Sequence, residues 1–373
     1  MKNKIGLITF YKNNYGSILQ CYATKKFLES NNYECEVLYQ KEKNKKLKKI
    51  LNYIKLILNS IKNPVILKDK IIMKKSMKKE LSYLNSDTVE KMDKFVKNEI
   101  EPKGYYWSEL RKKCNKQFKY FIVGSDQVWN ASRKIPDIYM LKFAEKNKRI
   151  AFGISIGVEK IPEFNKDLKN GVKGFNEISV REESAISEIS EIYKGKIERV
   201  GDPTTLYSKT EWKQFCKSVE LIYENYILIH FLNEPNDLAI KCINEYINKK
   251  GKIALCLGYS YDKYSRLSNY KIINGDPREY VALILNADAI FTDSFHTTLF
   301  SINLQKQFYV FHRQYLHNYA QTSRISNLLK RYSIMYNFIE KFEEFDVNKI
   351  TNDKDYLYND RINTRKYLLS KLK

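Results

Sequence analysis

Short apolar runs alternate with helix-like segments along most of this chain, and this alternation constrains the fold more than any other feature. The first apolar run, residues 4–10, is followed by a glycine-containing turn at 13–17, a helical pattern over 18–30 and a further run at 34–39. Buried strands that alternate with helices are typical of a parallel sheet with helical crossovers. The chain therefore opens with a βαβ unit, although it lacks the G-x-G-x-x-G pattern of a dinucleotide site.

The same alternation continues in two series. The first continues with strands expected at residues 120–123, 149–156, 177–180 and 197–200. The second has strands expected at 226–231, 252–257, 270–273, 289–292 and 307–311, and helices expected at 237–250, 278–287 and 297–304. Two such series predict an α/β protein with two Rossmann-like domains.

The domain boundaries follow from an interruption of this alternation. A chain of 373 residues is long for one ordinary core, and Pro203 with a polar segment separates the two series. We therefore predict an N-terminal domain over residues 1–205, a C-terminal domain over 206–340 and a helical tail over 341–373. A basic helical insertion over 41–100 is expected within the first domain.

Positive charge is concentrated in one part of that insertion. The chain has a formal net charge of +23, and residues 41–79 contribute 14 lysines against two acidic residues. Apolar residues recur there at helical spacing, at Leu47, Ile50, Leu51, Ile54, Leu58 and Ile61. The segment predicts either a basic amphipathic helix that docks on an anionic membrane surface or a solvated helix face above an ordinary core stripe. Nucleic acid is not expected as a partner, because no RNP-like or zinc-finger arrangement is present.

Cysteine usage and the amino terminus indicate the compartment. The cysteines form no C-x-x-C pair and no zinc-ligand cluster; they are Cys21, Cys35, Cys114, Cys216, Cys242 and Cys256. We expect reduced, buried thiols. The opening apolar run spans only five residues, too few for a signal peptide, and no run of 18 uncharged apolar residues occurs. The sequence predicts a cytoplasmic protein, which attaches to the inner face of the membrane if residues 41–79 form the docking helix rather than a solvated helix face.

A polar junction between a strand and a helix marks the first candidate site. The apolar run at 289–292 stops at Asp293-Ser294-Phe295-His296, and a helical pattern begins at once. Ligands of open α/β sheets bind at the carboxyl ends of strands, and the N–H groups at a helix amino end favour an anion. The segment therefore predicts an anion site.

Three further loops carry polar residues at the ends of predicted strands. Residues 121–130, FIVGSDQVWN, offer Ser125, Asp126, Gln127 and Trp129 either to a sugar or, for the short polar residues, as helix caps. Arg181, in ISVREESA, can bind a carboxylate or phosphate, or pair with a neighbouring glutamate. The first turn places Asn14, Tyr15, Gly16 and Ser17 on the same rim, or is simply a tight turn that requires glycine.

Together these segments resemble the polysaccharide pyruvyl transferase family. The resemblance rests on KIGLITFYKNNYGSILQCYATKKFL, FIVGSDQVWN, AFGISIG, ISVREESA, GDPTTLY and NGDPREYVALILNADAIFTDSFHTTLFSINLQKQFYVFHR. These segments occur in the family's order from residue 4 to about 335. The basic segment at 41–100 and the tail after 340 are weakly covered.

The resemblance implies a GT-B-like pair of Rossmann domains with a cleft between them. It also implies the transfer of pyruvate from phosphoenolpyruvate, as donor substrate, to a lipid- or nucleotide-linked saccharide, which forms a ketal during cell-surface polysaccharide biosynthesis. No cofactor and no metal are implied.

The resemblance also implies roles for particular residues. We expect His296 to act as acid and base, because histidine titrates near neutrality, and Arg181 to act with it. The expected donor-binding residues are Ser294, Phe295, Thr297, Thr298, Arg313 and Arg324. The expected acceptor-binding residues are Asn14, Tyr15, Gly16, Ser17, Ser125, Asp126, Gln127 and Trp129. His230 reads as a core residue, and His312 and His317 are weaker candidates near Arg313.

The chain departs from the family pattern beside its histidine. Ser294 stands where some members have an arginine, and Thr297 where many have glycine. Either Arg181, Arg313 and Arg324 replace that arginine, or the donor differs. Two other functions therefore stay open: a GT-B glycosyltransferase with a nucleotide-sugar donor, and a non-catalytic binding protein at a membrane surface.

Overall fold

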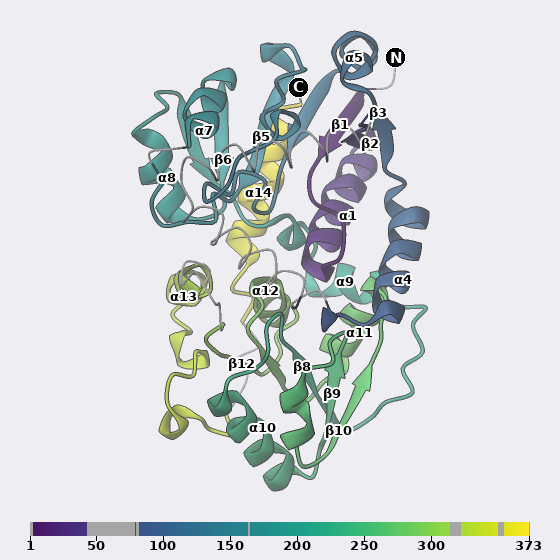
Figure 1. Ribbon diagram of the computed structural model, residues 1–373, viewed down its shortest axis with the longest axis vertical. Helices are drawn as coiled ribbons and strands as arrows, with labels where there is room; N and C mark the ends of the chain where they lie inside the picture. The colour runs from purple at the N-terminus through teal and green to yellow at the C-terminus, as the bar shows by residue number, and fades with distance from the viewer. Residues whose placement is uncertain are drawn as a thin grey trace, which may run out of the picture.

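The computed structural model describes residues 3–42, 79, 82–162, 165–313, 322–349 and 354–372. These residues form two domains, each built on a parallel sheet flanked by helices (Figure 1). The chain passes from the first sheet to the second between the last strand of one, Lys196–Arg199, and the first strand of the other, Tyr226–His230. The predicted fold class is confirmed.

The first sheet has the strand order β3-β2-β1-β4-β5-β6-β7. Its strands are β1 (Lys4–Ile8), β2 (Glu34–Gln40), β3 (Lys103–Tyr105), β4 (Tyr120–Val123), β5 (Arg149–Ile154), β6 (Glu177–Val180) and β7 (Lys196–Arg199). In the register, Leu7 of β1 lies between Val37 of β2 and Ile122 of β4, and all three side chains are buried. The direction of winding reverses between β1 and β4, so the carboxyl ends of these two strands form the switch point where ligands bind.

The second sheet repeats this plan with five strands in the order β10-β9-β8-β11-β12. The strands are β8 (Tyr226–His230), β9 (Ile253–Leu257), β10 (Tyr270–Ile273), β11 (Ile290–Thr292) and β12 (Phe308–Val310). Its switch point lies between β8 and β11, where Thr292 is in register with His230.

The helices begin at residues that can satisfy their free N–H groups. Asn14 caps the first helix by accepting from the Ser17 N–H at 3.1 Å, and Asp276 with Glu279 forms a capping box. The helices are α1 (Tyr15–Ser30), α4 (Ser86–Phe95), α5 (Trp107–Glu109), α6 (Asn115–Gln117), α7 (Lys166–Gly171), α8 (Glu183–Ser190), α9 (Lys209–Phe215), α10 (Asp237–Lys250), α11 (Pro277–Asn286), α12 (Phe295–Asn303), α13 (Thr322–Arg331) and α14 (Tyr358–Ser370).

The strands and helices predicted by apolar periodicity are present, with bounds shifted by a few residues. Strand β3 was not predicted from the sequence. It is a three-residue edge strand, KGY, without an apolar run, and it forms because its neighbour β2 offers free backbone groups. Pairing between distant segments therefore creates a strand that the local pattern does not encode.

Most of the predicted basic segment lies outside the described residues, which omit 43–78 and 80–81. The described part of the expected insertion, residues 82–100, lies against the second domain. There the N–H of Asn85 donates to the Gly258 carbonyl at 2.9 Å, and Lys91 pairs with Glu279 at 3.0 Å. Helix α4 thus connects the two domains.

The carboxyl-terminal helix α14 packs against the first domain and lies beside β5 and β6 in Figure 1. The hydroxyl of Thr364 accepts from the Gly201 N–H at 2.7 Å, and the ring of Tyr367 stacks on Phe152. The end of the chain therefore returns to the domain in which it began.

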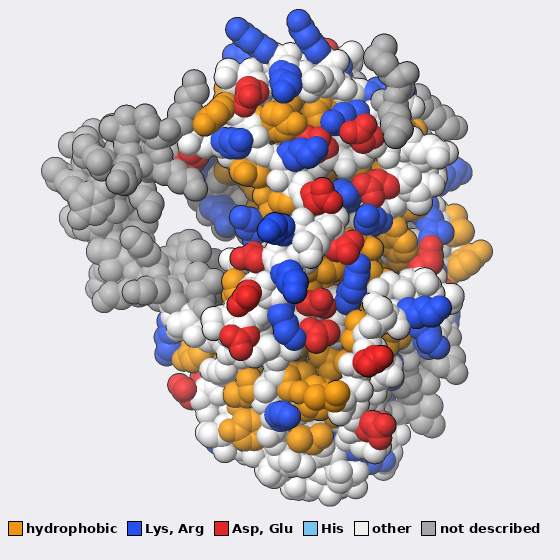
Figure 2. All heavy atoms as spheres, turned by 90° about the vertical axis from the view of Figure 1, so that its right-hand side faces the viewer, with side chains coloured by type: hydrophobic (Ala, Val, Ile, Leu, Met, Phe, Trp, Pro, Cys, Tyr) orange, Lys and Arg blue, Asp and Glu red, His pale blue; other side chains and the backbone are white. Residues whose placement is uncertain are grey.

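On the face shown in Figure 2, lysine and arginine side chains are interspersed with acidic ones over the described surface. All six cysteines are free and buried. Among the described residues, no helix is long and apolar enough to cross a membrane.

Candidate active site

The switch points of the two sheets face each other across a cleft of about 180 Å³. Asn14 and Ser17 follow β1, and Asp126 follows β4, on the first-domain wall. The second-domain wall is formed by residues that follow β8, β11 and β12 and by the start of α13. Its members are Leu232, Asp293, Ser294, Phe295, His296, Arg313, Arg324 and Ile325. Both domains therefore contribute polar side chains to one site.

His296 lies in the first turn of α12, with its side chain at the cleft. Ser294 is the N-cap of this helix and accepts from the Thr297 N–H at 3.4 Å, which orients the first turn. The imidazole Nε2 lies 3.5 Å from Oδ2 of Asp202, across the domain boundary, and has no hydrogen-bond partner among the described residues. Only 8% of His296 is exposed. The ring is thus held with its buried Nε2 beside the carboxylate of Asp202.

The start of α1 fixes how closely the first domain approaches this histidine. The hydroxyl of Tyr15 donates to the Gly275 carbonyl of the second domain at 2.6 Å, and its ring stacks on Tyr280 at 4.5 Å. The next residue, Gly16, packs so closely on His296 that a Cβ there would lie 2.1 Å from the imidazole Cγ. Glycine is therefore required by this contact between domains.

Arg181 follows β6 and is almost completely buried among carboxylates. It pairs with Asp202 at 2.6 Å, and lies 3.5 Å from Glu182 and 3.8 Å from Asp126. Burial alone would lower the pKa of Arg181, but these three carboxylates outweigh it and raise the pKa above its ordinary value. The guanidinium therefore carries a permanent charge.

The two carboxylates nearest to His296 are held in the ionised form. Burial favours the neutral form of Asp202, but the adjacent imidazole of His296, together with Arg181, lowers its pKa well below the ordinary value. The pKa of Asp126 is also lowered against the effect of burial, by the charges of His296 and Arg181 and by the hydroxyl of Ser17, which donates at 2.7 Å. Two negatively charged carboxylates therefore lie close to the imidazole ring.

Phe295 separates the cleft from the buried arginine. Its ring lies 4.4 Å from the guanidinium carbon of Arg181 and 5.6 Å from that of Arg324, so it packs between cations from the two domains. In the amide orientation that satisfies both its oxygen and its nitrogen, the Gln127 side-chain oxygen accepts from Arg324 Nη1 at 2.8 Å. Arg324 thus contacts the first domain while its side chain lines the cleft.

The second-domain wall holds another arginine above a buried carboxylate. Asp293 accepts from the N–H groups of Leu232 and Asn233, and its Oδ2 lies 3.7 Å from Nε of Arg313. Burial raises the pKa of Asp293, although Arg313 acts in the opposite sense. The result is a cationic side chain held at the cleft by a buried acid.

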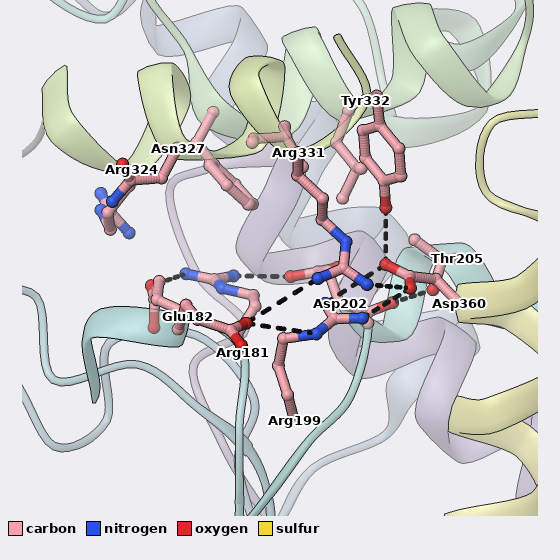
Figure 3. A pocket seen from close by; sticks show the side chains of 15 residues that line it. Arg181, Glu182, Arg199, Asp202, Thr205, Arg324, Asn327, Arg331, Tyr332 and Asp360 are labelled. Carbon is pink, nitrogen blue, oxygen red and sulfur yellow. Dashed lines mark hydrogen bonds and ion pairs between the residues drawn. The ribbon is translucent and has the colours of Figure 1, made fainter. Parts of the chain in front are cut away.

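A larger cavity of about 310 Å³ lies behind Phe295. Figure 3 shows Arg199 and Arg331 converging on Asp360, at 2.6 Å and 2.8 Å, with Arg181 and Arg324 on the other side. Arg331 comes from α13 and Arg199 from the end of β7, so this cluster joins the second domain to the first through α14.

The structure brings many of the residues predicted from sequence to the cleft. The lining includes Asn14, Ser17, Asp126, Gln127, Ser294, Phe295, His296, Arg313 and Arg324. Arg181 lines the cavity behind Phe295 instead. The others lie beneath the cleft surface: Tyr15, Gly16, Ser125, Thr297 and Thr298 are buried.

The prediction that Trp129 binds the acceptor sugar is wrong. Its indole is fully buried against Phe175, and its N–H donates to the Tyr139 carbonyl at 2.7 Å. A ring with both faces packed in the core presents no surface to a ligand. Among the histidines, His230 is buried as expected, and His312 is half-exposed beside Glu340. His317 lies outside the described residues.

Six residues without a role predicted from sequence contact the site or line it: Asp202, Asp293, Phe10, Arg133, Leu232 and Ile325. The sequence could have placed Asp202 and Asp293 at the site, because both lie just after predicted strands, in GDPTTLY and TDSFH. Phe10 also lies at the end of a predicted strand, whereas the sequence gives no signal for Arg133, which lies in the loop between β4 and β5.

Two Rossmann-like domains whose switch points face each other across a polar cleft define the GT-B class of proteins. Known GT-B structures share this arrangement. A UDP-GlcNAc 2-epimerase from Methanocaldococcus jannaschii is 16% identical, with a TM-score of 0.54 and 99% of each chain covered. The Neisseria meningitidis enzyme bound to UDP-GlcNAc is 12% identical, with a TM-score of 0.48 and the same coverage. Arabidopsis thaliana UGT89C1 complexed with UDP-L-rhamnose is 8% identical, with a TM-score of 0.46, covering 100% of this chain and 99% of that one.

At 16% identity, the likeness to the Methanocaldococcus jannaschii enzyme shows the fold alone. The family is shown by sequence: residues 14–315 match the polysaccharide pyruvyl transferase family, and the chain belongs to it. A comparison with curated protein sequences found no significant match. The resemblance drawn from the motifs is confirmed, and the protein is a transferase of this family.

Proposed function

We propose that this protein transfers the pyruvyl group of phosphoenolpyruvate to a saccharide, forming a ketal during the biosynthesis of a cell-surface polysaccharide. The observation that carries the proposal is the position of His296. The histidine of the TDSFH motif lies at the meeting point of both domains, beside Asp202 and within a cleft lined by Arg313 and Arg324. This is the combination of proton donor and fixed positive charge that the reaction needs.

The donor carries a carboxylate and a phosphate on a three-carbon frame. Arg313 and Arg324 line the cleft on the second-domain side, and the first N–H groups of α12 add donors at the same place. In this arrangement the two arginines take the place of the arginine that some family members have at the position of Ser294. The donor therefore lies against the second domain.

His296 then moves the proton that starts the reaction. Its imidazolium donates a proton to the methylene carbon of the donor, and the double bond becomes an oxocarbenium-like centre at the adjacent carbon. A saccharide hydroxyl attacks this carbon, and its proton returns to the neutral imidazole of His296. The bond between this carbon and the phosphate oxygen then breaks, and phosphate leaves with the electron pair. A second hydroxyl attacks the resulting oxocarbenium-like carbon and closes the ketal, and its proton goes to the departing phosphate.

The buried charges around His296 support these steps. The lowered pKa values of Asp202 and Asp126 keep both carboxylates ionised beside the imidazole. Arg181 lies behind Phe295 and pairs with Asp202, so we assign it a positioning role: it holds the carboxylates in place. This role differs from the direct part in catalysis that the family resemblance implies.

The acceptor lies on the first-domain wall. Asn14, Ser17, Asp126 and Gln127 offer hydroxyl, amide and carboxylate groups there to sugar hydroxyls. A lipid- or nucleotide-linked saccharide is the acceptor class that we propose.

The test is to incubate the purified protein with phosphoenolpyruvate and a panel of lipid- and nucleotide-linked saccharides. We expect phosphate release together with a pyruvate mass increment on the saccharide. Turnover of a nucleotide sugar, with none of phosphoenolpyruvate, would contradict the proposal and favour a glycosyltransferase.

The residue-level test compares two histidines. His296→Ala should lower the rate by about 10²- to 10⁴-fold, the usual contribution of a general acid, without loss of fold by circular dichroism. The matched control is His312→Ala, because His312 lies on the exposed surface beside Glu340 and outside the cleft lining. A nearly normal rate for His296→Ala would remove this residue as the proton donor.

A further inference from the structure

A second hollow of about 490 Å³ adjoins the cleft on the first domain. It lies at the carboxyl ends of β1 and β2, where Thr9, Phe10 and Tyr11 follow β1 and Tyr39 ends β2. Phe10 and Ser17 line both this hollow and the cleft, so the two spaces share a wall. Its volume falls within the range of about 300–1,000 Å³ typical of ligand sites.

Aromatic rings dominate the lining of this hollow. Phe10 and Tyr139 meet edge to face at 5.2 Å, and Tyr11 and Tyr39 complete the group. Tyr39 is 39% exposed, and its ring lies over Gly104 of β3, where a Cβ would approach the ring to 2.5 Å. The absence of a side chain at Gly104 therefore leaves room for the tip of the Tyr39 ring beside the neighbouring strand. Rings with hydroxyl groups suit a ligand that has both apolar faces and hydroxyls.

The charges of the two spaces differ. The cleft contains His296 and the guanidinium groups of Arg133, Arg313 and Arg324. Among the described residues, the lining of the aromatic hollow has one basic and one acidic member, Lys12 and Glu42. This described lining therefore lacks the excess of positive charge that would select an anion, and it favours a neutral polyhydroxy ligand.

From the shared wall, the rings and the balanced charge, we propose that the aromatic hollow binds a neutral sugar unit of the acceptor, next to the unit that receives pyruvate. This inference rests on the proposed function for the identity of the acceptor. It assigns Tyr39 as a specificity residue that recognises a saccharide of two or more units.

The binding test uses neutral disaccharides and trisaccharides of glucose, galactose, mannose and N-acetylglucosamine, without phosphoenolpyruvate. Saturation-transfer NMR should detect at least one binder, and Tyr39→Ala should weaken its binding about tenfold, the loss expected for one aromatic contact. The matched control is Tyr270→Ala, because Tyr270 is also a strand tyrosine, is 37% exposed and lies in β10 of the other domain. Circular dichroism checks that both variants fold.

Absence of binding by every saccharide, or equal loss in the Tyr39 and Tyr270 variants, would overturn the proposal. The turnover assay separates this result from failure of the proposed function. If the saccharides bind through Tyr39 but phosphoenolpyruvate is never consumed, the proposed reaction fails and the sugar site stands. If pyruvyl transfer occurs and Tyr39→Ala leaves KM for the saccharide unchanged, the sugar site fails and the reaction stands.

Discussion

Gly16→Ala tests the central geometric feature of the site, which is the contact between α1 and His296. The added Cβ would lie 2.1 Å from both Cγ and Nδ1 of the imidazole and 2.5 Å from Cβ of His296. Carbon atoms in contact lie about 3.5–4.0 Å apart, so one side must move by more than about 1 Å. The clash involves the base of the histidine side chain, and rotation of a flexible tip cannot relieve it.

Helix α1 of the first domain cannot easily move away from His296 to relieve this clash. Tyr15 anchors the start of α1 in the second domain through Gly275 and Tyr280, and Ser17 holds Asp126. We therefore expect His296 to move. A displacement of about 1 Å at a reacting group typically costs about 10²-fold in rate, and overpacking costs about 1–3 kcal/mol in stability. The expected variant is folded, slightly less stable and severely impaired in kcat.

The assay combines kinetics with NMR of the imidazole rings. The chain has four histidines, so their ring signals can be assigned by substitution, and Gly16→Ala should shift that of His296 most. The matched control is Gly174→Ala, whose Cβ would meet only the movable tip of Arg149, at 2.5 Å from Nη1. A Gly16→Ala variant with normal kcat and an unshifted His296 signal would refute the reasoning.

Three other features of the chain can be tested by substitution. Tyr15→Phe removes the hydrogen bond to the Gly275 carbonyl and should lower the free energy of unfolding by about 1 kcal/mol. It should also reduce kcat more than it raises KM for the donor. An unchanged kcat would show that the role of Tyr15 is purely structural. Burial and Arg313 lower the pKa of His230 in the folded protein to about 3, whereas its pKa in the unfolded chain is about 6.5. Between these two values the unfolded chain binds a proton at His230 and the folded protein does not. The free energy of unfolding is therefore highest above pH 6.5 and falls as the pH falls toward 3. Urea unfolding of His230→Asn should therefore show a smaller loss of stability between pH 7 and 4 than the unaltered protein, and an identical slope would contradict this. Replacement of several lysines in residues 41–79 by glutamine should weaken binding to anionic vesicles in a salt-sensitive way, and unchanged binding would refute the membrane role of that segment.

The architecture of this protein follows from local patterns in its sequence. Apolar runs such as residues 226–231 and 289–292 are long enough to be buried on both faces, and such strands are stable only in a parallel sheet covered by helices. The polar residues that interrupt these runs necessarily lie at strand ends. Asp126 and His296 can therefore be placed at the ligand-binding edges of the sheets from the sequence pattern.

What each of these residues faces depends instead on the packing of the two domains. Arg181 and Trp129 follow strands just as Asp126 does, yet one is buried among carboxylates behind Phe295 and the other is packed in the core. Asp202 meets His296 because the two domains approach each other at Gly16 and Tyr15, far from either residue in the sequence. Periodicity reports the local preference of the chain for water or for a core, whereas partners across a cleft are set by how two folded surfaces fit together.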